Sequence, residues 1–283
     1  MKQLSVIICT FLLLSSVNCY ANESRNKVIS TINSNYYTEN MAKTVEKIQN
    51  IDRTLSDNDY FEAVFNCLDD YSMYYNSVQT EDLTIYKIEE MITYDRKENL
   101  KVKIVYFGNG IEKVFSEQVS IAKKHGLKTL ILDLTECPGG YVHVMNSIAN
   151  EIMPKGKIMT AKFRNKEQVY YSELEKCPFD EIIVKVSTQT ASAAEILAAG
   201  LQETGVAKVV GVNTYGKTSI QSFHRLESGA AFKLTCGEYL TRNGNDISKT
   251  GVIPDIVDYS YPVKIRWNDY CKEVFRNNKA VSE

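Results

Sequence analysis

The 283-residue sequence is poor in the residues that mark specialised protein classes: it contains three histidines, five prolines and seven cysteines. Its apolar fraction of 44% and charged fraction of 24% are those of a folded globular protein, which excludes a collagen-like, disordered or multi-span membrane chain. It also lacks an excess of basic charge, since its net charge is −2. Without that excess there is little to hold a nucleic-acid backbone, so we expect no nucleic-acid partner.

Long apolar runs are absent except at the beginning of the chain. Residues 1–21 hold one lysine, a charge-free run from Leu4 to Val17 and small residues before Asn22. This pattern is typical of a signal peptide, and the run is shorter than the roughly 20 residues that cross a bilayer as a helix. We therefore expect a signal peptide at 1–21, no stable membrane span, and an exported protein that is periplasmic, extracellular or associated with the cell envelope. Retention as an anchor and lipidation at Cys19 are the alternatives.

The cysteines beyond this segment do not form a recognisable framework. They are widely spaced, odd in number and without a CxxC pair: Cys67, Cys137, Cys177, Cys236 and Cys271. Such spacing indicates neither a disulfide scaffold nor a metal or redox site. We expect no metal and no cofactor, and the alternatives for the thiols are one or two disulfides or buried free cysteines.

Apolar periodicity divides the remaining chain into a helical region at 22–82, an α/β core at 83–262 and a C-terminal tail at 263–283. Helix-spaced apolar residues predict helices over 38–51 and from Asp57, the expected N-cap, to Leu68. At the start of the core, two strands around a polar turn predict a hairpin formed by residues 83–94 and 100–107.

From Gly110 onward, helical and strand patterns alternate, which is typical of a partly parallel α/β sheet. The predicted helices span 111–125, 141–153 and 192–203, and the predicted strands span 129–134, 182–186 and 206–212. The strand at 129–134 (TLILDL) is almost entirely apolar, which predicts a sheet covered on both faces. Residues 219–255 are predicted to form short strands separated by turns at Ser228-Gly229 and Asn243-Gly244.

None of the three histidines is a good candidate for catalysis. His125 lies at a predicted helix end, His143 near a helix start and His224 in a predicted strand, and none adjoins a nucleophile or a metal-ligand partner. A histidine-dependent hydrolase is therefore poorly supported.

A stronger candidate is Ser192, in the segment TASAAEI at 190–196. A hydroxyl at the start of a helix lies in the positive field of the helix N-terminus, and the next N–H, that of Ala193, is free to face a developing oxyanion. The alternative is that Ser192 is only an N-cap. A serine nucleophile needs a base, and Lys217, in the tight turn Tyr215-Gly216-Lys217, is a candidate because burial can lower the pKa of an ammonium group. The alternative for Lys217 is a solvated turn lysine.

Taken together, these segments resemble the tail-specific, or carboxyl-terminal processing, serine peptidases. The resemblance rests on the order and spacing of motifs over about residues 100–257: PGG at 138–140, TASAAEI at 190–196, YGK at 215–217, Gln221, and GVIPDI at 251–256. It implies an α/β fold with a crotonase-like βαβ catalytic core after a small N-terminal helical region.

The resemblance also implies a role for each matching residue. Ser192 would be the acylated nucleophile, Lys217 the general base, and Gln221 the group that orients Lys217. The backbone amides of Gly139 and Ala193 would form the oxyanion hole. The implied substrate is a peptide or protein, and the oligomeric state stays unknown.

The sequence departs from the family's usual pattern in two places. The stretch at 84–99 is too short for the PDZ domain that many members carry there, so recognition of substrate carboxyl termini by such a domain is not implied, and the plan resembles the PDZ-lacking branch that includes the nisin resistance protein. Thr135, Glu136 and Cys137 also differ from the residue types usual before the PGG turn. The alternative hypotheses are a catalytically silent peptide-binding protein on the same fold and a crotonase-type acyl-thioester enzyme.

Overall fold

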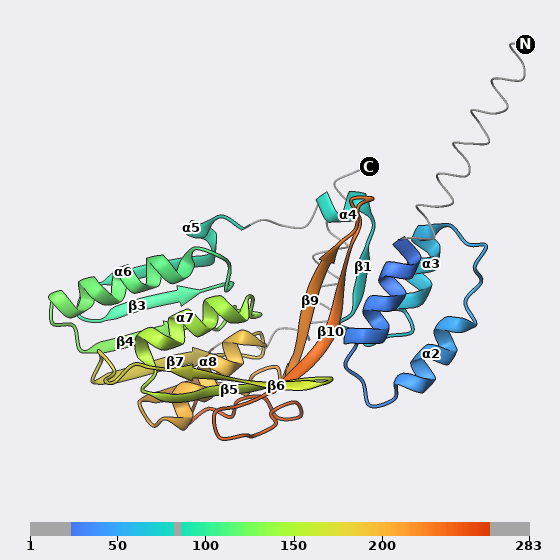
Figure 1. Cartoon of the computed structure of the whole chain (residues 1–283). Coiled ribbons are helices and arrows are strands. Elements are labelled where there is room, and N and C mark those ends of the chain that lie inside the picture. Colours follow the sequence, from blue (N-terminus) through green and yellow to red (C-terminus); the bar gives the residue numbers. More distant parts are fainter. Residues whose placement is uncertain (1–23, 82–85, 261–283) are drawn as a thin grey trace, which may run out of the picture. The chain divides into compact units, whose positions relative to one another are not determined.

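The computed structural model of the chain describes residues 24–81 and 86–260 (Figure 1). The predicted signal peptide and the predicted tail at 263–283 lie outside these residues. Packing divides the chain into two compact units. Of the described residues, the first unit comprises 24–81, 163–165 and 220–237, and the second comprises 86–162, 166–219 and 238–260. The boundary that the sequence pattern predicts between a helical region and an α/β core, after residue 82, stays a prediction.

The first unit has an apolar core built by helices and one β-ribbon. Its helices are residues 24–35, α2 (Met41–Gln49), α3 (Asp57–Phe65) and α4 (Ser77–Glu81), and β1 (Met73–Tyr75) pairs antiparallel with residues 231–233 of β10 (Ala231–Leu240). Side chains from these elements form one buried cluster, including Val28, Ile32, Phe61, Val64 and Phe232. The helix at 24–35 has no counterpart among the predicted elements, because its few apolar residues are scattered among polar ones.

The predicted N-cap of α3 is wrong by one residue. Ser56 precedes the helix, and its hydroxyl accepts a hydrogen bond from the Asp59 N–H at 3.3 Å. Asp57 is instead the first helical residue, where its carboxylate accepts from Arg25 Nε at 2.6 Å. The serine caps because its short hydroxyl reaches the free N–H groups of the first turn while the aspartate turns toward a cation.

The second unit contains a six-stranded sheet in the order β11-β8-β7-β4-β3-β2. The strands are β2 (Ile92–Arg96), β3 (Leu100–Ile104), β4 (Thr129–Asp133), β7 (Glu181–Val186), β8 (Ala207–Gly211) and β11 (Ile256–Val257). All neighbouring pairs are parallel except β2 with β3. The partly parallel α/β sheet is therefore confirmed, and so is the hairpin of β2 and β3. The first predicted strand begins too early, because Ile88–Met91 forms the helical turn α5.

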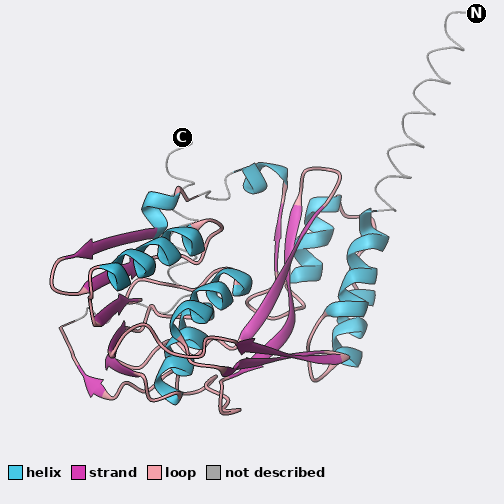
Figure 2. Cartoon of the chain, turned by 60° about the vertical axis from the view of Figure 1, so that its left-hand side comes forward, coloured by secondary structure: helices cyan, strands magenta, loops and turns pink. Residues whose placement is uncertain are grey.

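Three helices lie against one face of this sheet: α6 (Ile111–Lys124), α7 (Val142–Ile152) and α8 (Ala193–Glu203) (Figure 1, Figure 2). Contacts run from β2 and β3 to α6, then through α7 to α8 and β8. Burial alternates along β4, where Leu130 and Leu132 are fully buried and Ile131 is partly exposed. The expectation of two covered faces is thus not met among the described residues, since the three helices form a single layer.

Two long hairpins complete the described chain. The hairpin of β5 (Gly156–Phe163) and β6 (Lys166–Ser172) has no counterpart among the predicted elements. The region from 219 contains β9 (Ser219–Arg225) and the ten-residue β10, which are longer than the short strands expected there. The turns at Gly229 and Gly244 are confirmed by left-handed φ angles of 83° and 87°. Both strands begin in one packing unit and end in the other.

The described residues also bear on the expectations about thiols and membranes. Cys67, Cys137, Cys177 and Cys236 are all free thiols, and Cys271 lies outside the described residues. Within 24–81 and 86–260, every helix is too short or too polar to cross a bilayer. The same residues contain no group of three or more histidines, cysteines and carboxylates placed to hold a metal ion.

Candidate active site

Ser192 has a backbone conformation unlike that of any other described residue except glycines. It follows β7 and immediately precedes α8, with φ 56° and ψ −122°, and it is the only non-glycine residue in the described ranges with a positive φ. A β-carbon makes this region unfavourable by roughly 1–3 kcal/mol, and a sharp strand-to-helix turn of this kind presents a nucleophile in other hydrolases. The strained turn favours a functional serine over a simple N-cap.

The loop after β4 is pinned against the loop that carries Ser192. Thr190 donates its hydroxyl proton to the Leu134 carbonyl at 2.8 Å, and the Ala191 N–H donates to the Cys137 carbonyl at 3.0 Å. Cys137 is fully buried, and burial raises the pKa of its thiol to about 12, so it serves as a neutral packing group. These bonds hold the PGG turn and the serine turn in a fixed relation.

Gly139 lies directly beside the nucleophile candidate. A β-carbon at Gly139 would lie 2.9 Å from Ser192 Cβ and 3.1 Å from the Ala193 nitrogen, and its φ of 108° is one that glycine adopts readily. Within the described part of the chain, neither the Gly139 N–H nor the Ala193 N–H has a hydrogen-bond partner. Two neighbouring backbone donors next to a serine are what an oxyanion hole requires.

Lys217 is a buried lysine, with 7% of its surface exposed. It lies in the irregular segment between β8 and β9, and its ammonium nitrogen donates to the Ser219 carbonyl at 2.8 Å. The alternative of a solvated turn lysine is therefore wrong.

Glu195 links the backbones of the serine and the lysine, and sequence reasoning did not single it out. Its Oε2 accepts from the Ser192 N–H and from the Lys217 N–H, both at 2.8 Å. Its Oε1 accepts from the Gly216 N–H at 2.6 Å and from the Thr214 hydroxyl. One buried carboxylate thus binds both turns at once.

Burial controls the ionisation of Glu195. Desolvation raises its pKa above the ordinary 4.5, and the four hydrogen bonds that its oxygens accept act in the opposite direction. The sequence contained one usable signal, because Glu195 is a carboxylate three positions after Ser192 in a helix of small residues, which is the spacing of a capping box.

Tyr239 is a second residue that sequence reasoning missed. Its hydroxyl donates to the Ser192 carbonyl at 3.3 Å, and its N–H donates to the Thr218 carbonyl at 3.0 Å. Burial raises its pKa far above the ordinary value, so the phenol stays neutral. It supports the serine turn from β10, where no local motif marks it.

Gln221 belongs to the first packing unit, on β9, whereas the other four predicted site residues belong to the second. Its Nε2 donates to the Thr235 hydroxyl oxygen at 3.2 Å. Gln221 is half-buried and hydrogen-bonded rather than an ordinary exposed strand residue.

The elements explain why the second-unit residues converge. The PGG turn follows β4, Ser192 follows β7 and Lys217 follows β8, and these three strands are neighbours in the parallel sheet. Their carboxyl ends lie at one edge, which is where open α/β sheets place their sites. The carboxyl edge of the sheet thus carries a serine hydroxyl, two backbone N–H groups and a buried lysine, which are the types of group that acyl transfer needs.

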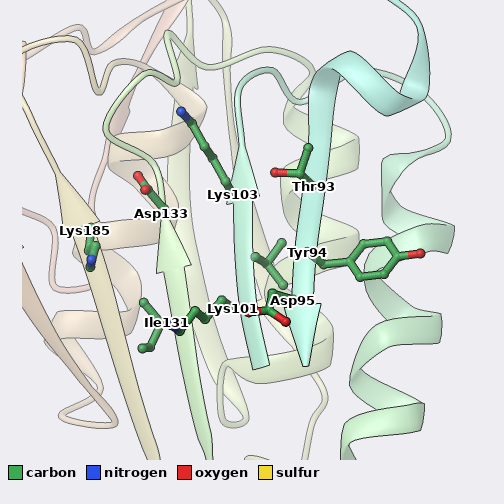
Figure 3. Close-up of a pocket in the computed structure, with 9 residues that line it drawn as sticks. Thr93, Tyr94, Asp95, Lys101, Lys103, Ile131, Asp133 and Lys185 are labelled. Carbon is green, nitrogen blue, oxygen red and sulfur yellow. The ribbon is translucent and has the colours of Figure 1, made fainter. Parts of the chain in front are cut away.

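A separate hollow of about 240 Å³ lies on the face of the sheet that the helices do not cover (Figure 3). Lys101, Lys103 and Lys185 line it together with Ile131 and Asp133. None of the residues around Ser192 contributes to it, so this hollow is distinct from the candidate active site.

Known proteins resemble this chain in sequence and in fold. Residues 100–258 match the family described as Peptidase family S41. The chain is 33% identical over 174 residues to the carboxy-terminal processing protease CtpA of Bacillus subtilis, a match that covers 61% of this chain and 36% of that protein. The chain thus spans little more than a third of the length of this relative.

Two solved structures are similar in fold. The photosystem II D1 C-terminal processing protease superposes with a TM-score of 0.53 at 22% identity, over 62% of this chain and 49% of that one. A lipoprotein from Streptococcus agalactiae superposes with a TM-score of 0.63 at 15% identity, over 90% of this chain and 96% of that one. At these identities the similarity establishes the fold alone.

Proposed function

The chain belongs to peptidase family S41, as its match over residues 100–258 shows, and we propose that it is a serine endopeptidase that hydrolyses peptide bonds of exported proteins or peptides. The predicted resemblance to carboxyl-terminal processing peptidases is confirmed by this family and by the CtpA relative. The observation that carries the proposal is the strained serine turn, joined to the lysine turn through one oxygen of Glu195.

In the proposed reaction, Ser192 Oγ attacks the carbonyl carbon of the scissile bond while Lys217, as a neutral amine, takes the hydroxyl proton. The negative charge that develops on the carbonyl oxygen is stabilised by the N–H groups of Gly139 and Ala193, and one such donor contributes about 3 kcal/mol in the transition state. Lys217 then returns the proton to the leaving amine. A water molecule hydrolyses the acyl-enzyme by the same steps in reverse order.

Gln221 is proposed to orient the lysine base, as the family resemblance implies. The crotonase-like character of the core is proposed with it, supported by the parallel sheet with its helices on one face and the oxyanion turn at the carboxyl end of β4. We also propose that the chain is exported with the aid of residues 1–21, in keeping with the signal-peptide pattern of that segment.

The test is cleavage of a mixed peptide library, read by mass spectrometry, with the chain from Asn22 onward and its Ser192→Ala and Lys217→Ala variants. We expect both variants to lose all cleavage sites while keeping the thermal unfolding profile of the parent. Lys208→Ala is the matched control, because Lys208 is an exposed lysine on β8, and it should cleave normally. Turnover near the parental level in Ser192→Ala would refute the assignment.

The pH dependence supplies a second measurement of the same proposal. Hydrolysis should rise with pH as the lysine base loses its proton, and a rate that is flat from about pH 5 to 9 would contradict a lysine base. Peptide binding without cleavage by any form would favour the silent binding protein, and cleavage of acyl-thioesters but not peptides would favour the crotonase-type enzyme.

A further inference from the structure

A chain of hydrogen bonds inside the first packing unit ends at Gln221. Gln221 Nε2 lies 3.2 Å from Thr235 Oγ1, and Thr235 Oγ1 lies 3.0 Å from Asp69 Oδ1. Asp69 comes from the loop between α3 and β1, Thr235 from β10 and Gln221 from β9. The loop that carries Asp69 is therefore linked to the Gln221 side chain through Thr235.

The chemistry of the three groups determines which one donates and which one accepts in each of these hydrogen bonds. A carboxylate can only accept hydrogen bonds, so the Thr235 hydroxyl must donate its proton to Asp69. The lone pairs of that hydroxyl then accept from a donor, and only the NH₂ end of the Gln221 amide can supply one. The carbonyl oxygen of Gln221 is thereby assigned to the opposite end of the amide, where it is an acceptor.

The partners of Gln221 are themselves held firmly. The Asp69 oxygen that binds Thr235 also accepts from the Tyr71 and Ser72 N–H groups, both at 2.8 Å. The Thr235 N–H donates to Ser72 Oγ at 3.0 Å. Thr235 and Ser72 are 4% and 5% exposed, so water does not compete for these bonds.

Tyr36 and Tyr37, which follow the helix at 24–35, form hydrogen bonds with Asp69 and Thr235. The Tyr36 hydroxyl accepts from the Asp69 N–H at 2.9 Å, and the Tyr37 N–H donates to the Thr235 carbonyl at 3.0 Å. Burial raises the pKa of Tyr36 to about 12, so its phenol is neutral at ordinary pH. The N-terminal helical region thus supports the residues behind Gln221.

We propose that Thr235, oriented by Asp69, is a positioning residue that fixes the orientation of the Gln221 amide, with the NH₂ end of the amide on Thr235. This inference rests on the proposed peptidase function, in which Gln221 orients Lys217. It gives the N-terminal helical region a part in catalysis, because Tyr36 and Asp69 both lie there.

The test compares Thr235→Val, which removes the hydroxyl at nearly constant volume, with Thr235→Ser, which retains it. Hydrolysis of fluorescein-labelled casein is followed across pH, with Ser192→Ala as the blank. We expect Thr235→Val to lower kcat about tenfold, the effect of losing one buried hydrogen bond, with KM changed less than about twofold. Thr235→Ser should restore kcat to within about twofold.

The pH profile separates positioning from a structural role. An acceptor that holds a lysine favours its charged form, so the pH of half-maximal kcat should move to lower values in Thr235→Val. A merely structural defect would lower the melting temperature without moving this midpoint. Thr235→Ser should keep the parental midpoint.

A second readout does not depend on turnover. The side-chain NH₂ signals of Gln221, assigned by their loss in Gln221→Met, are followed by ¹⁵N–¹H NMR in the full chain. We expect them to shift in Thr235→Val and to stay in place in Thr235→Ser. Unmoved signals, or a parental kcat in Thr235→Val, would overturn the inference. Parental protein that fails to cleave casein while these signals shift would instead count against the peptidase function and leave the amide orientation standing.

Discussion

At the scale of single residues, the site contains a strained backbone at Ser192 and a buried carboxylate at Glu195, and an ordinary helix start has neither. Ser192 is a non-glycine residue with φ 56°, and Glu195 is a carboxylate with no exposed surface. Both features oppose folding, so the surrounding hydrogen bonds must offset them. Relieving the strain at Ser192 is therefore expected to raise stability while abolishing catalysis, whereas removing the Glu195 carboxylate is expected to lower both.

Ser192→Gly should abolish hydrolysis and stabilise the fold. Glycine occupies positive φ without a β-carbon penalty, so the free energy of unfolding should rise by about 1 kcal/mol. Chemical denaturation measures the change, and Ser192→Ala, which keeps the β-carbon, is the control that should show no gain. Equal stabilities of the two variants would argue against strain at this turn.

Glu195→Gln should destabilise the protein. A glutamine has one carbonyl oxygen, so its NH₂ group would face two of the four donors that the carboxylate satisfies, at a cost of about 2 kcal/mol. Casein hydrolysis should fall as well, because the serine and lysine turns lose their common partner.

The pH dependence of this loss has a definite sign. Because burial raises the pKa of Glu195 above 4.5, the folded state holds this proton more tightly than the unfolded state does. Its contribution to stability is largest below pH 4.5 and is lost as pH rises through the folded pKa. Glutamine lacks this decline, so the stability difference between parent and variant should be larger at low pH. A difference that grows with pH would contradict the direction of the shift.

At the scale of elements, the hydrophobic pattern predicted the strands and helices of the sheet because each carries its own local signal. The helix at 111–125 and the strand at 129–134 are confirmed to within a residue at each end. The helix at 24–35 was missed because its apolar residues are sparse. The hairpin of β5 and β6 was missed although β5 contains the buried Ile158, Met159 and Ala161, because a short apolar run does not by itself identify a strand. The N-cap of α3 was misplaced because Ser56 and Asp57 are both good caps and only the ion pair with Arg25 decides between them.

Gly139→Ala tests whether the PGG turn supplies an oxyanion donor. The new β-carbon would lie 2.9 Å from the Ala191 carbonyl oxygen and from Ser192 Cβ, so the turn must move away from the nucleophile. We expect hydrolysis to fall by at least about a hundredfold, the cost of one lost oxyanion donor. Gly126→Ala is the matched control, because it has φ 69° and open space around the added carbon, and it should lose about 1 kcal/mol of stability and no activity. Equal activities of the two variants would contradict the oxyanion assignment.

At the scale of the whole molecule, the chain passes repeatedly between two packing units. Residues 163–165 and 220–237 belong to the first unit although they are flanked by segments of the second. Ser192, Lys217 and the PGG turn lie in the second unit, and Gln221 with its partners lies in the first. A change in the core of the first unit should therefore act on Gln221 without touching the serine turn.

Ile32→Ala should show this separation. Ile32 is fully buried in the core of the first unit, and its truncation should cost about 2–5 kcal/mol. Hydrogen exchange should accelerate in 24–75 and 226–234 and remain slow in the sheet strands at 129–133 and 182–186. Uniform acceleration across both units would show that they unfold as one.

The sequence by itself determined the alternating α/β pattern, because local periodicity can be followed along the chain. It also showed that the chain has no excess of basic charge and no recognisable cysteine framework. The order and spacing of its motifs pointed to the site candidates Ser192, Lys217, Gln221, Gly139 and Ala193. Only the tertiary structure decided that Glu195 binds the serine and lysine turns, that Tyr239 supports the serine from β10, and that Asp69 and Thr235 lie behind Gln221. Apart from the Ser192–Glu195 bond, which spans three positions, these contacts join residues 14 to 166 positions apart. Their partners are chosen by how strands order themselves in a sheet, which no local pattern encodes.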